Sequence, residues 1–226
     1  MAHDEVGGLH AAAAGVSPAH REGWMDCRLA AGCGWPPSGY SLVELLVCLA
    51  LSLTLAGLAA PAVLGARDIV RAASAGDHLA AVLQRARTEA LKRNAHVAVR
   101  FEADGSSFRY ALYVDGNGDG VRTVQIASGL DRQLQAPERV EQHFPGVQFG
   151  LAEGVPAVDG EGAGDRDPIR VGRSRMISFS PAGTCTPGTV YLLGRGHQQL
   201  AVRALGATGR IRTLHFNFAE AAWRAR

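Results

Sequence analysis

The most metal-like stretch of the sequence is DGNGDG, which begins at Asp115. Asp115, Asn117 and Asp119 alternate like the first ligands of a calcium loop, and a glycine at the sixth position could supply the turn. The twelfth position, however, is Ile126, so the bidentate glutamate of such a loop is missing. Two interpretations remain open: a polar Asx-Gly turn between two strands, or a weak calcium site.

Two arginines, Arg210 and Arg212, stand two residues apart in the stretch GRIR. On a strand this spacing places both side chains on one face. Arg203 could lie nearby across a hairpin. Only Lys92 of the 23 basic residues is a lysine, so arginine is abundant throughout. A solvated strand face is therefore one interpretation of this pair. The other, a face that contacts phosphates in a salt-dependent, sequence-independent manner, depends on the family resemblance given below.

Residue types that commonly carry catalysis or bind zinc form no recognisable pattern. The eight histidines are scattered, without Asp or Ser at recurrent spacing. The cysteines are Cys27, Cys33, Cys48 and Cys185, and their spacing supports no zinc site. Only Cys185 lies in the part of the chain after residue 67, which we expect to be soluble, so no disulfide can form within that part. Cys185 also has no evident activating neighbour. We expect no enzymatic activity and no cofactor, with calcium at Asp115 as the one exception left open.

A carboxylate, Glu44, lies near the start of a long apolar run. Residues 42–64 are apolar except for Glu44, Ser52, Thr54 and Pro61. About twenty such residues, rising 1.5 Å each, span the hydrocarbon core of a bilayer. A carboxylate in hydrocarbon costs several kcal/mol unless it is paired or close to the interface. Glu44 is therefore expected either to reach the membrane edge or to pair with a cation.

The elements that position these residues follow from hydrophobic periodicity. The sequence predicts one helix over residues 41–93, with its first half in lipid and its second half amphipathic. Leu79 and Leu83 belong to the apolar stripe of the second half, and Asn94 is the predicted stop. Pro61 removes a backbone hydrogen bond inside the helix and should kink it.

Beyond the helix, the hydrophobic period changes to two, which indicates strands. The strand candidates are HVAVRFEA, SFRYALYVD, RTVQIA, MISFS, TVYLLGR, QLAVRAL and RIRTLHFNF. DGSS and GATG read as hairpin turns, PERVEQHF as a short helix, and residues 158–168 as a glycine-rich, charged loop. The predicted fold class is α+β, a long N-terminal helix packed on antiparallel sheets.

Composition and pattern together predict the division of the chain. The net charge is only +2 and the hydrophobic share is 47%, with much of the apolar excess in the opening segment. We expect a leader over residues 1–39 and a transmembrane helix over residues 40–64. The helix should continue as an amphipathic segment over residues 65–94. A β-rich domain over residues 95–218 and a tail over residues 219–226 complete the chain.

The stretch GYSLVELLV, residues 39–47, resembles the signal sequence of type IV pilins and of type II secretion pseudopilins. LQRARTEALKRNAHVAVRF, ISFSPAGT, GTVYL and GATGRIR resemble the pseudopilin H and FimT group in particular. The resemblance implies that prepilin peptidase cleaves between Gly39 and Tyr40 and methylates the new N-terminus at Tyr40. It implies a pilin-like fold, in which Pro61 lies where long pilin helices bend. It also implies that Glu44 pairs with the N-terminal ammonium of a neighbouring subunit during assembly.

The resemblance implies two alternative functions. The first is a minor pseudopilin at the tip of the type II secretion pseudopilus, which drives protein export across the outer membrane. Such a subunit is held in the inner membrane by a single pass, with its C-terminal domain in the periplasm. Its partners are other minor and major pseudopilins, prepilin peptidase, the inner-membrane secretion platform and membrane lipid. The second is a FimT-like minor type IV pilin that binds DNA through Arg210 and Arg212 for uptake.

Overall fold

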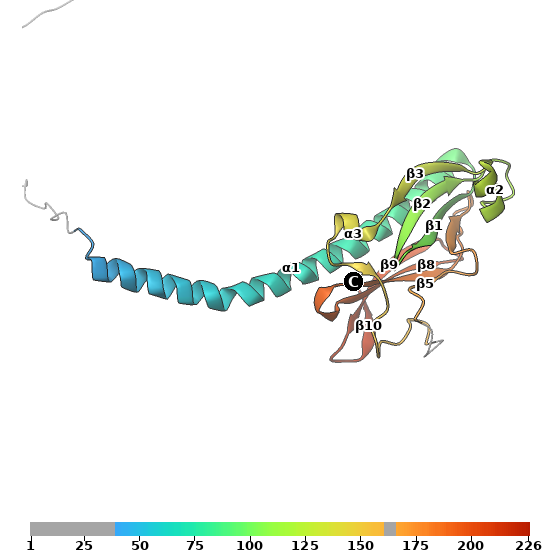
Figure 1. Cartoon of the computed structure of the whole chain (residues 1–226). Coiled ribbons are helices and arrows are strands. Elements are labelled where there is room, and N and C mark those ends of the chain that lie inside the picture. The colour runs from blue at the N-terminus through green and yellow to red at the C-terminus, as the bar shows by residue number, and fades with distance from the viewer. Residues whose placement is uncertain (1–38, 161–165) are drawn as a thin grey trace, which may run out of the picture. The chain divides into compact units, whose positions relative to one another are not determined.

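The computed structural model of the chain describes residues 39–160 and 166–226 (Figure 1). Residues 1–38 lie outside the described residues. They are the predicted leader without its last residue, Gly39, and they include two of the four cysteines. Residues 161–165, part of the predicted glycine-rich loop, also lie outside them.

Two compact units divide the chain, Met1–Ala50 and Leu51–Arg226, and each is described by itself. Their boundary falls inside one helix, α1 (Leu42–Arg93), which confirms the predicted long helix. The hydroxyl and carbonyl oxygens of Ser41 accept the first backbone N–H groups of the helix at 3.3 and 3.1 Å. Asn94 has φ 50, the left-handed conformation that ends many helices.

Within the second unit, α1 has an exposed part and a buried part. Residues 51–67 are exposed, and further along one face is buried at three- and four-residue steps. The buried residues of α1 are Ala72, Ala75, Gly76, Leu79, Val82, Leu83, Ala86 and Ala90. A Cβ atom at Gly76 would lie 3.1 Å from a Leu200 methyl and 3.2 Å from the Thr213 methyl. The small residues of this face therefore let the helix backbone lie close against a sheet.

The first sheet among the described residues has four strands in the order β3-β2-β1-β6. Its strands are β1 (Val97–Asp104), β2 (Ser107–Val114), β3 (Arg132–Glu138) and β6 (Met176–Phe179). Neighbouring strands are antiparallel. Asp104 lies opposite Ser107, and Gly105 between them has φ 65, so β1 and β2 form the predicted hairpin with a two-residue turn.

The second sheet follows the order β10-β9-β8-β7-β4, and β5 also pairs with β7. Its strands are β4 (Gln148–Phe149), β5 (Ile169–Arg170), β7 (Gly188–Leu193), β8 (Gln199–Leu205), β9 (Arg210–Asn217) and β10 (Ala222–Ala225). A 3₁₀ helix, η1 (Arg195–His197), connects β7 to β8. The predicted GATG turn connects β8 to β9, because β8 ends at Leu205 and β9 begins at Arg210.

The main core contains side chains from the second half of α1 and from both sheets. Leu79 and Leu83 of α1 are fully buried together with Phe101 of β1, Tyr110 of β2 and Leu192 of β7. Figure 1 shows this part of α1 alongside the strands. One helix and two antiparallel sheets thus share one core, which confirms the predicted α+β, pilin-like fold.

The prediction that RTVQIA forms a strand is wrong. These residues form most of a short helix, α2 (Thr123–Ser128), which has no buried residue. The Asp131 carboxylate accepts the Arg122 N–H at 2.8 Å and fixes the entry to the helix. Gly129 has φ 79 and donates its N–H to Ile126, which closes the helix end. These local hydrogen bonds outweigh the strand preference of valine and isoleucine.

The predicted helix PERVEQHF is shorter in the structure. Only α3 (Val140–His143) is helical, and Pro137 and Glu138 belong to β3. The Gln142 side chain accepts the Arg139 N–H at 3.3 Å and caps the start of the helix, so that only Arg139 separates the strand from the helix.

A strand, β10, lies within the predicted tail, residues 219–226. Trp223 anchors this strand, because its ring packs 5.7 Å from the ring of Tyr191 and its Nε1 donates to the Pro156 carbonyl at 2.9 Å. The sheet therefore extends beyond residue 218. The short stretch AWRA has too few alternating residues to predict a strand.

Candidate functional site

The first half of α1 is exposed and apolar. Every residue from 39 to 67 is exposed, and α1 alone among the described helices is long and apolar enough to cross a membrane. Its large exposed side chains up to residue 64 include Leu42, Val43, Leu45, Leu46, Val47, Leu49, Leu51, Leu53, Leu55, Leu58, Val63 and Leu64. An apolar surface of this extent is stable only in lipid or against another apolar partner. Pro61 lies inside this stretch, within α1.

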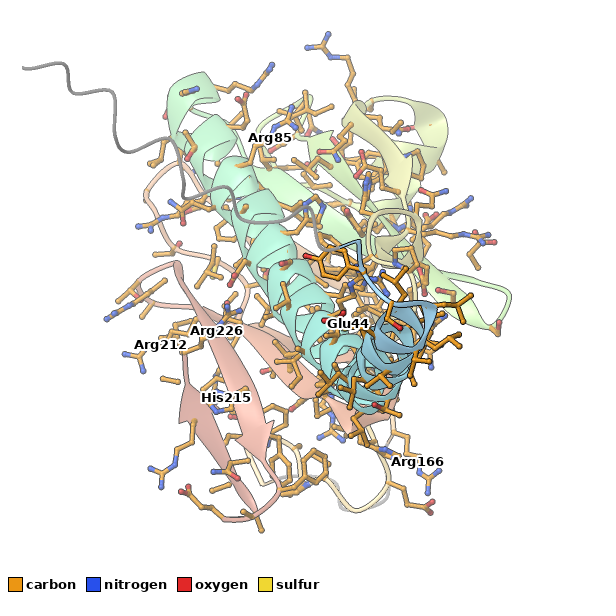
Figure 2. The ribbon with its side chains drawn as sticks, turned by 90° about the vertical axis from the view of Figure 1, so that its left-hand side faces the viewer. Glu44, Arg85, Arg166, Arg212, His215 and Arg226 are labelled. Carbon is orange, nitrogen blue, oxygen red and sulfur yellow. The ribbon has the colours of Figure 1, made fainter. Side chains whose placement is uncertain are left out.

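Glu44 lies in the first turn of α1, where Figure 2 shows its side chain. The N-terminus of a helix carries a partial positive charge, which stabilises a carboxylate there by about 0.3–1 kcal/mol. Gly39 and Tyr40 precede the helix, and both are exposed. Apart from Gly39 and its chain neighbours, no described heavy atom lies within 4 Å of a Cβ placed at Gly39. A side chain at this position would therefore meet no described neighbour.

The two arginines singled out from the sequence lie at the start of β9. Arg210 and Arg212 are exposed, and Arg212 lies directly opposite Arg203 of β8. Arg203 pairs with Asp159 at 2.5 Å. Figure 2 shows Arg212 close to Arg226, which donates to the Asp77 carboxylate at 3.1 Å. Two of these guanidinium groups are therefore paired with carboxylates.

Arg210, Arg212 and Arg226 line one groove of about 600 Å³, together with Asp77 of α1. Its chemistry suits an anion with several oxygens, since guanidinium groups bind phosphates and carboxylates in a bidentate manner. The described wall of the groove includes no aromatic side chain on which a base could stack. The arginines could thus contact a phosphate backbone but would not select bases.

The DGNGDG stretch forms a turn organised by Asp115. One carboxylate oxygen of Asp115 accepts the N–H groups of Asn117 and Gly118 at 3.0 and 2.8 Å. The other accepts the Gly120 N–H at 2.7 Å. Burial acts to raise the pKa of Asp115, but these three backbone hydrogen bonds outweigh it, and the pKa lies below its ordinary value.

A second carboxylate closes the same turn. Asp131 accepts the Gly116 N–H at 3.1 Å with one oxygen and the Arg122 N–H at 2.8 Å with the other. Asp119 is exposed and accepts the Gln125 side-chain amide at 3.0 Å. The oxygens of Asp115 and Asp131 thus already serve backbone N–H groups, which favours the Asx-Gly turn over the calcium interpretation. Calcium binding by Asp115, Asn117 and Asp119 stays a prediction.

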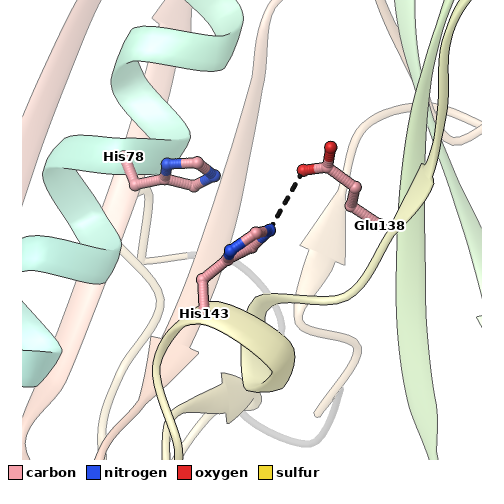
Figure 3. Close-up of side chains that lie close together, drawn as sticks. All are labelled: His78, Glu138 and His143. Carbon is pink, nitrogen blue, oxygen red and sulfur yellow. Dashed lines mark ion pairs between the residues drawn. The ribbon is translucent and has the colours of Figure 1, made fainter.

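Three side chains that no motif had singled out lie together beside α1 (Figure 3). His78 comes from α1, Glu138 from the end of β3 and His143 from the end of α3. One ring nitrogen of each histidine and one carboxylate oxygen lie within 4.8 Å of one another. His143 Nε2 is 3.3 Å from Glu138 Oε2, and His78 Nε2 is 2.9 Å from the hydroxyl of Tyr110.

Comparison with known families finds a match to the type II transport protein GspH family over residues 75–208. This covers more than half of the chain. The chain belongs to the GspH family. No curated protein and no solved structure matches it.

The GspH family consists of pseudopilins, which are structural subunits of type II secretion systems and not enzymes. The matched residues include most of the buried half of α1, the Asp115 turn and the cluster of His78, Glu138 and His143. The exposed apolar half of α1 precedes the match, and Arg210 and Arg212 follow it. The family therefore identifies the folded domain, while the properties of Glu44 and of the arginines depend on their own geometry.

Proposed function

We propose that this GspH-family chain is a minor pseudopilin in the tip of the type II secretion pseudopilus, where it serves protein export across the outer membrane. The observation that carries the proposal is the exposed apolar half of α1, which is continuous with the helix that the GspH-type domain buries. A subunit of this form can lie in lipid before assembly and in a bundle of similar helices afterwards.

The apolar half has the length that a membrane anchor requires. Residues 42–64 at 1.5 Å each extend about 34 Å, slightly more than the hydrocarbon core of a bilayer. We propose that this segment crosses the inner membrane once and that the domain after it lies in the periplasm. Its membrane partner is lipid, and its assembly partner is the inner-membrane secretion platform.

Processing supplies the charge that Glu44 requires. Cleavage between Gly39 and Tyr40 by prepilin peptidase creates an ammonium group at Tyr40, which the same enzyme methylates. In a helical bundle, Glu44 of one subunit pairs with this ammonium of a neighbouring major or minor pseudopilin. The low dielectric strengthens the pair, so one axial register of the helices is favoured over the others. The exposed position of Glu44 in the first helical turn supports this arrangement.

A functional exchange tests the proposal. The full chain is expressed in a cell whose type II secretion system lacks its own H subunit, and secretion and co-purifying pseudopilins are measured. We expect restored secretion and recovery of other pseudopilins with the chain. If the chain reaches the membrane but recovers no pseudopilin and restores no secretion, the proposal fails.

The alternative function is a FimT-like minor pilin that binds DNA for uptake. The observation in its favour is the groove that Arg210, Arg212 and Arg226 line on the second sheet. Expression of the full chain in a competent cell whose pilus lacks FimT, with transformation as the measured quantity, separates the two functions. Restored transformation without restored secretion would favour the pilus function.

A further inference from the structure

We propose that His78, Glu138 and His143 bind one zinc ion, which fastens the segment from β3 to α3 onto the buried half of α1. The proposal is independent of the secretion function, since it concerns the folded domain alone. The three ligand atoms lie within 4.8 Å of one another, and each comes from a different element (Figure 3).

The ligand set has the chemistry of a zinc site. Two imidazoles and one carboxylate form a three-residue zinc set in which water takes the fourth position. Tetrahedral bonds of about 2.0–2.1 Å place neighbouring ligand atoms about 3.3 Å apart. His143 Nε2 and Glu138 Oε2 already have this separation, at 3.3 Å. Only modest side-chain movement is needed to bring a ring nitrogen of His78 to the same distance, because one ligand atom of each side chain lies within 4.8 Å of the others. Zinc at His78 Nε2 would replace the contact of that nitrogen with the Tyr110 hydroxyl at 2.9 Å.

The two histidines differ in exposure. His78 is half-buried on α1, where it packs against the rings of His143 and Phe144. His143 is exposed, which gives an ion a path from solvent.

A second layer of contacts holds the carboxylate in place. Tyr110 is fully buried on β2, and its hydroxyl donates to Glu138 Oε2 at 3.2 Å. Outer hydrogen bonds of this kind orient metal ligands and typically change metal affinity by about 10–100-fold when removed.

The position of the cluster indicates what the ion would do. The helix α3 has four residues, too few to be stable alone, and β3 is an edge strand of the first sheet. The contacts between this segment and α1 include the rings of His78, His143 and Phe144, with centroids 5.3 and 5.5 Å from His78. A zinc ion would add bonds among the same elements and stabilise the folded state by an amount that rises with the logarithm of the free zinc concentration above its Kd.

The experiment uses the full chain in detergent, stripped of metal with a chelator and titrated with zinc chloride. We expect the wild-type chain to bind one zinc ion more than His143→Gln or Glu138→Gln, and to melt at a higher temperature with zinc than without it. Histidines of residues 1–39 are the same in all variants, so the difference of one ion isolates the cluster. Tyr110→Phe should lower the affinity of the cluster for zinc by about tenfold.

A matched control is His215→Gln, which removes an exposed histidine from β9 (Figure 2). It should leave zinc binding and its thermal effect unchanged. Equal zinc binding by the wild-type chain and His143→Gln would overturn the proposal.

A second measurement uses cobalt and needs no variant. The metal-free wild-type chain with cobalt should show the intense visible absorption of tetrahedral cobalt, and added zinc should remove it. A weak octahedral spectrum would contradict the site.

Discussion

Arg212 of β9 lies directly opposite Arg203 of β8 in the antiparallel register. Like charges in this relationship repel each other and destabilise a sheet. Asp159 pairs with Arg203 at 2.5 Å and offsets part of that repulsion. Arg212, with Arg210 beside it on the same strand, remains exposed. A polyanion that binds here would relieve the remaining repulsion.

Replacement of both exposed arginines tests whether this surface binds DNA. If Arg210 and Arg212 each contact one phosphate, Arg210→Ala/Arg212→Ala in the full chain weakens binding to duplex DNA. It also reduces the slope of log affinity against log salt by about 1.8, since each phosphate contact contributes about 0.9. Fluorescence anisotropy at several salt concentrations measures both effects.

A charge-matched control is Arg132→Ala/Arg173→Ala, which removes two exposed arginines from other parts of the second unit. This variant should keep the wild-type salt slope. Should both double variants bind DNA with the same affinity and slope as the wild-type chain, the DNA-uptake function fails.

Loss of the Glu44 carboxylate should affect assembly and leave membrane insertion intact. Glu44→Ala makes the apolar half of α1 more hydrophobic, so the protein should still fractionate with membranes. Without its partner for the Tyr40 ammonium, it should no longer co-purify with other pseudopilins. Thr54→Ala is the control, because the Thr54 hydroxyl donates to Leu51 within its own helix at 2.8 Å. Normal co-purification of Glu44→Ala would contradict the intersubunit pair.

Processing at Gly39 is tested by the N-terminus of the membrane-bound chain. We expect mass spectrometry to identify Tyr40 as the first residue, with an added methyl group. Gly39→Val should leave the fold unchanged, since nothing lies within 4 Å of a Cβ at Gly39, but should prevent cleavage. Gly57→Val, at a position that is equally open, should be cleaved normally. An uncleaved wild-type chain in the membrane would exclude the proposed pairing.

The sequence pattern correctly predicted those elements whose conformation depends mainly on their own residues. The long helix α1 was predicted to within one residue, because the apolar run and the helical period after it continue without a break up to a stop at Asn94. β3 was missed, because its stretch RQLQAPE has no buried residue and its pairing with β2 is irregular. This stretch is a strand because it pairs with β2, and the sequence alone does not reveal that the two segments are neighbours.

The candidate sites divide in the same way. Glu44 and the pair of Arg210 and Arg212 could be recognised because spacing along one element defines them. The cluster of His78, Glu138 and His143 could not, because its members are far apart in the sequence. They meet only where the end of β3 and α3 lie beside α1. Tertiary contacts of this kind leave no local period.

Calcium binding at the DGNGDG turn is decided by thermal stability. The oxygens of Asp115 already accept three backbone N–H groups, and Ile126 stands where a calcium loop has its bidentate glutamate. We expect millimolar calcium to leave the melting temperature of the full chain unchanged relative to magnesium. A calcium-specific rise that Asp119→Asn removes would instead establish the weak calcium site.

Asp115 should make the stability of the domain depend on pH in the acid range. Asp115→Asn loses charged hydrogen bonds to backbone N–H groups, so it should destabilise the domain at pH 7 by about 2 kcal/mol. The folded-state pKa of Asp115 lies below its unfolded value of 3.8, so this contribution is full above pH 3.8 and is lost as the pH falls through the folded-state pKa. The difference in melting temperature between the two proteins should therefore shrink below about pH 4. Asp119→Asn, at an exposed position, should differ little from wild type at any pH. A difference for Asp115→Asn that stays constant down to the acid unfolding of the wild-type chain would show that its carboxylate is not the source of the stability.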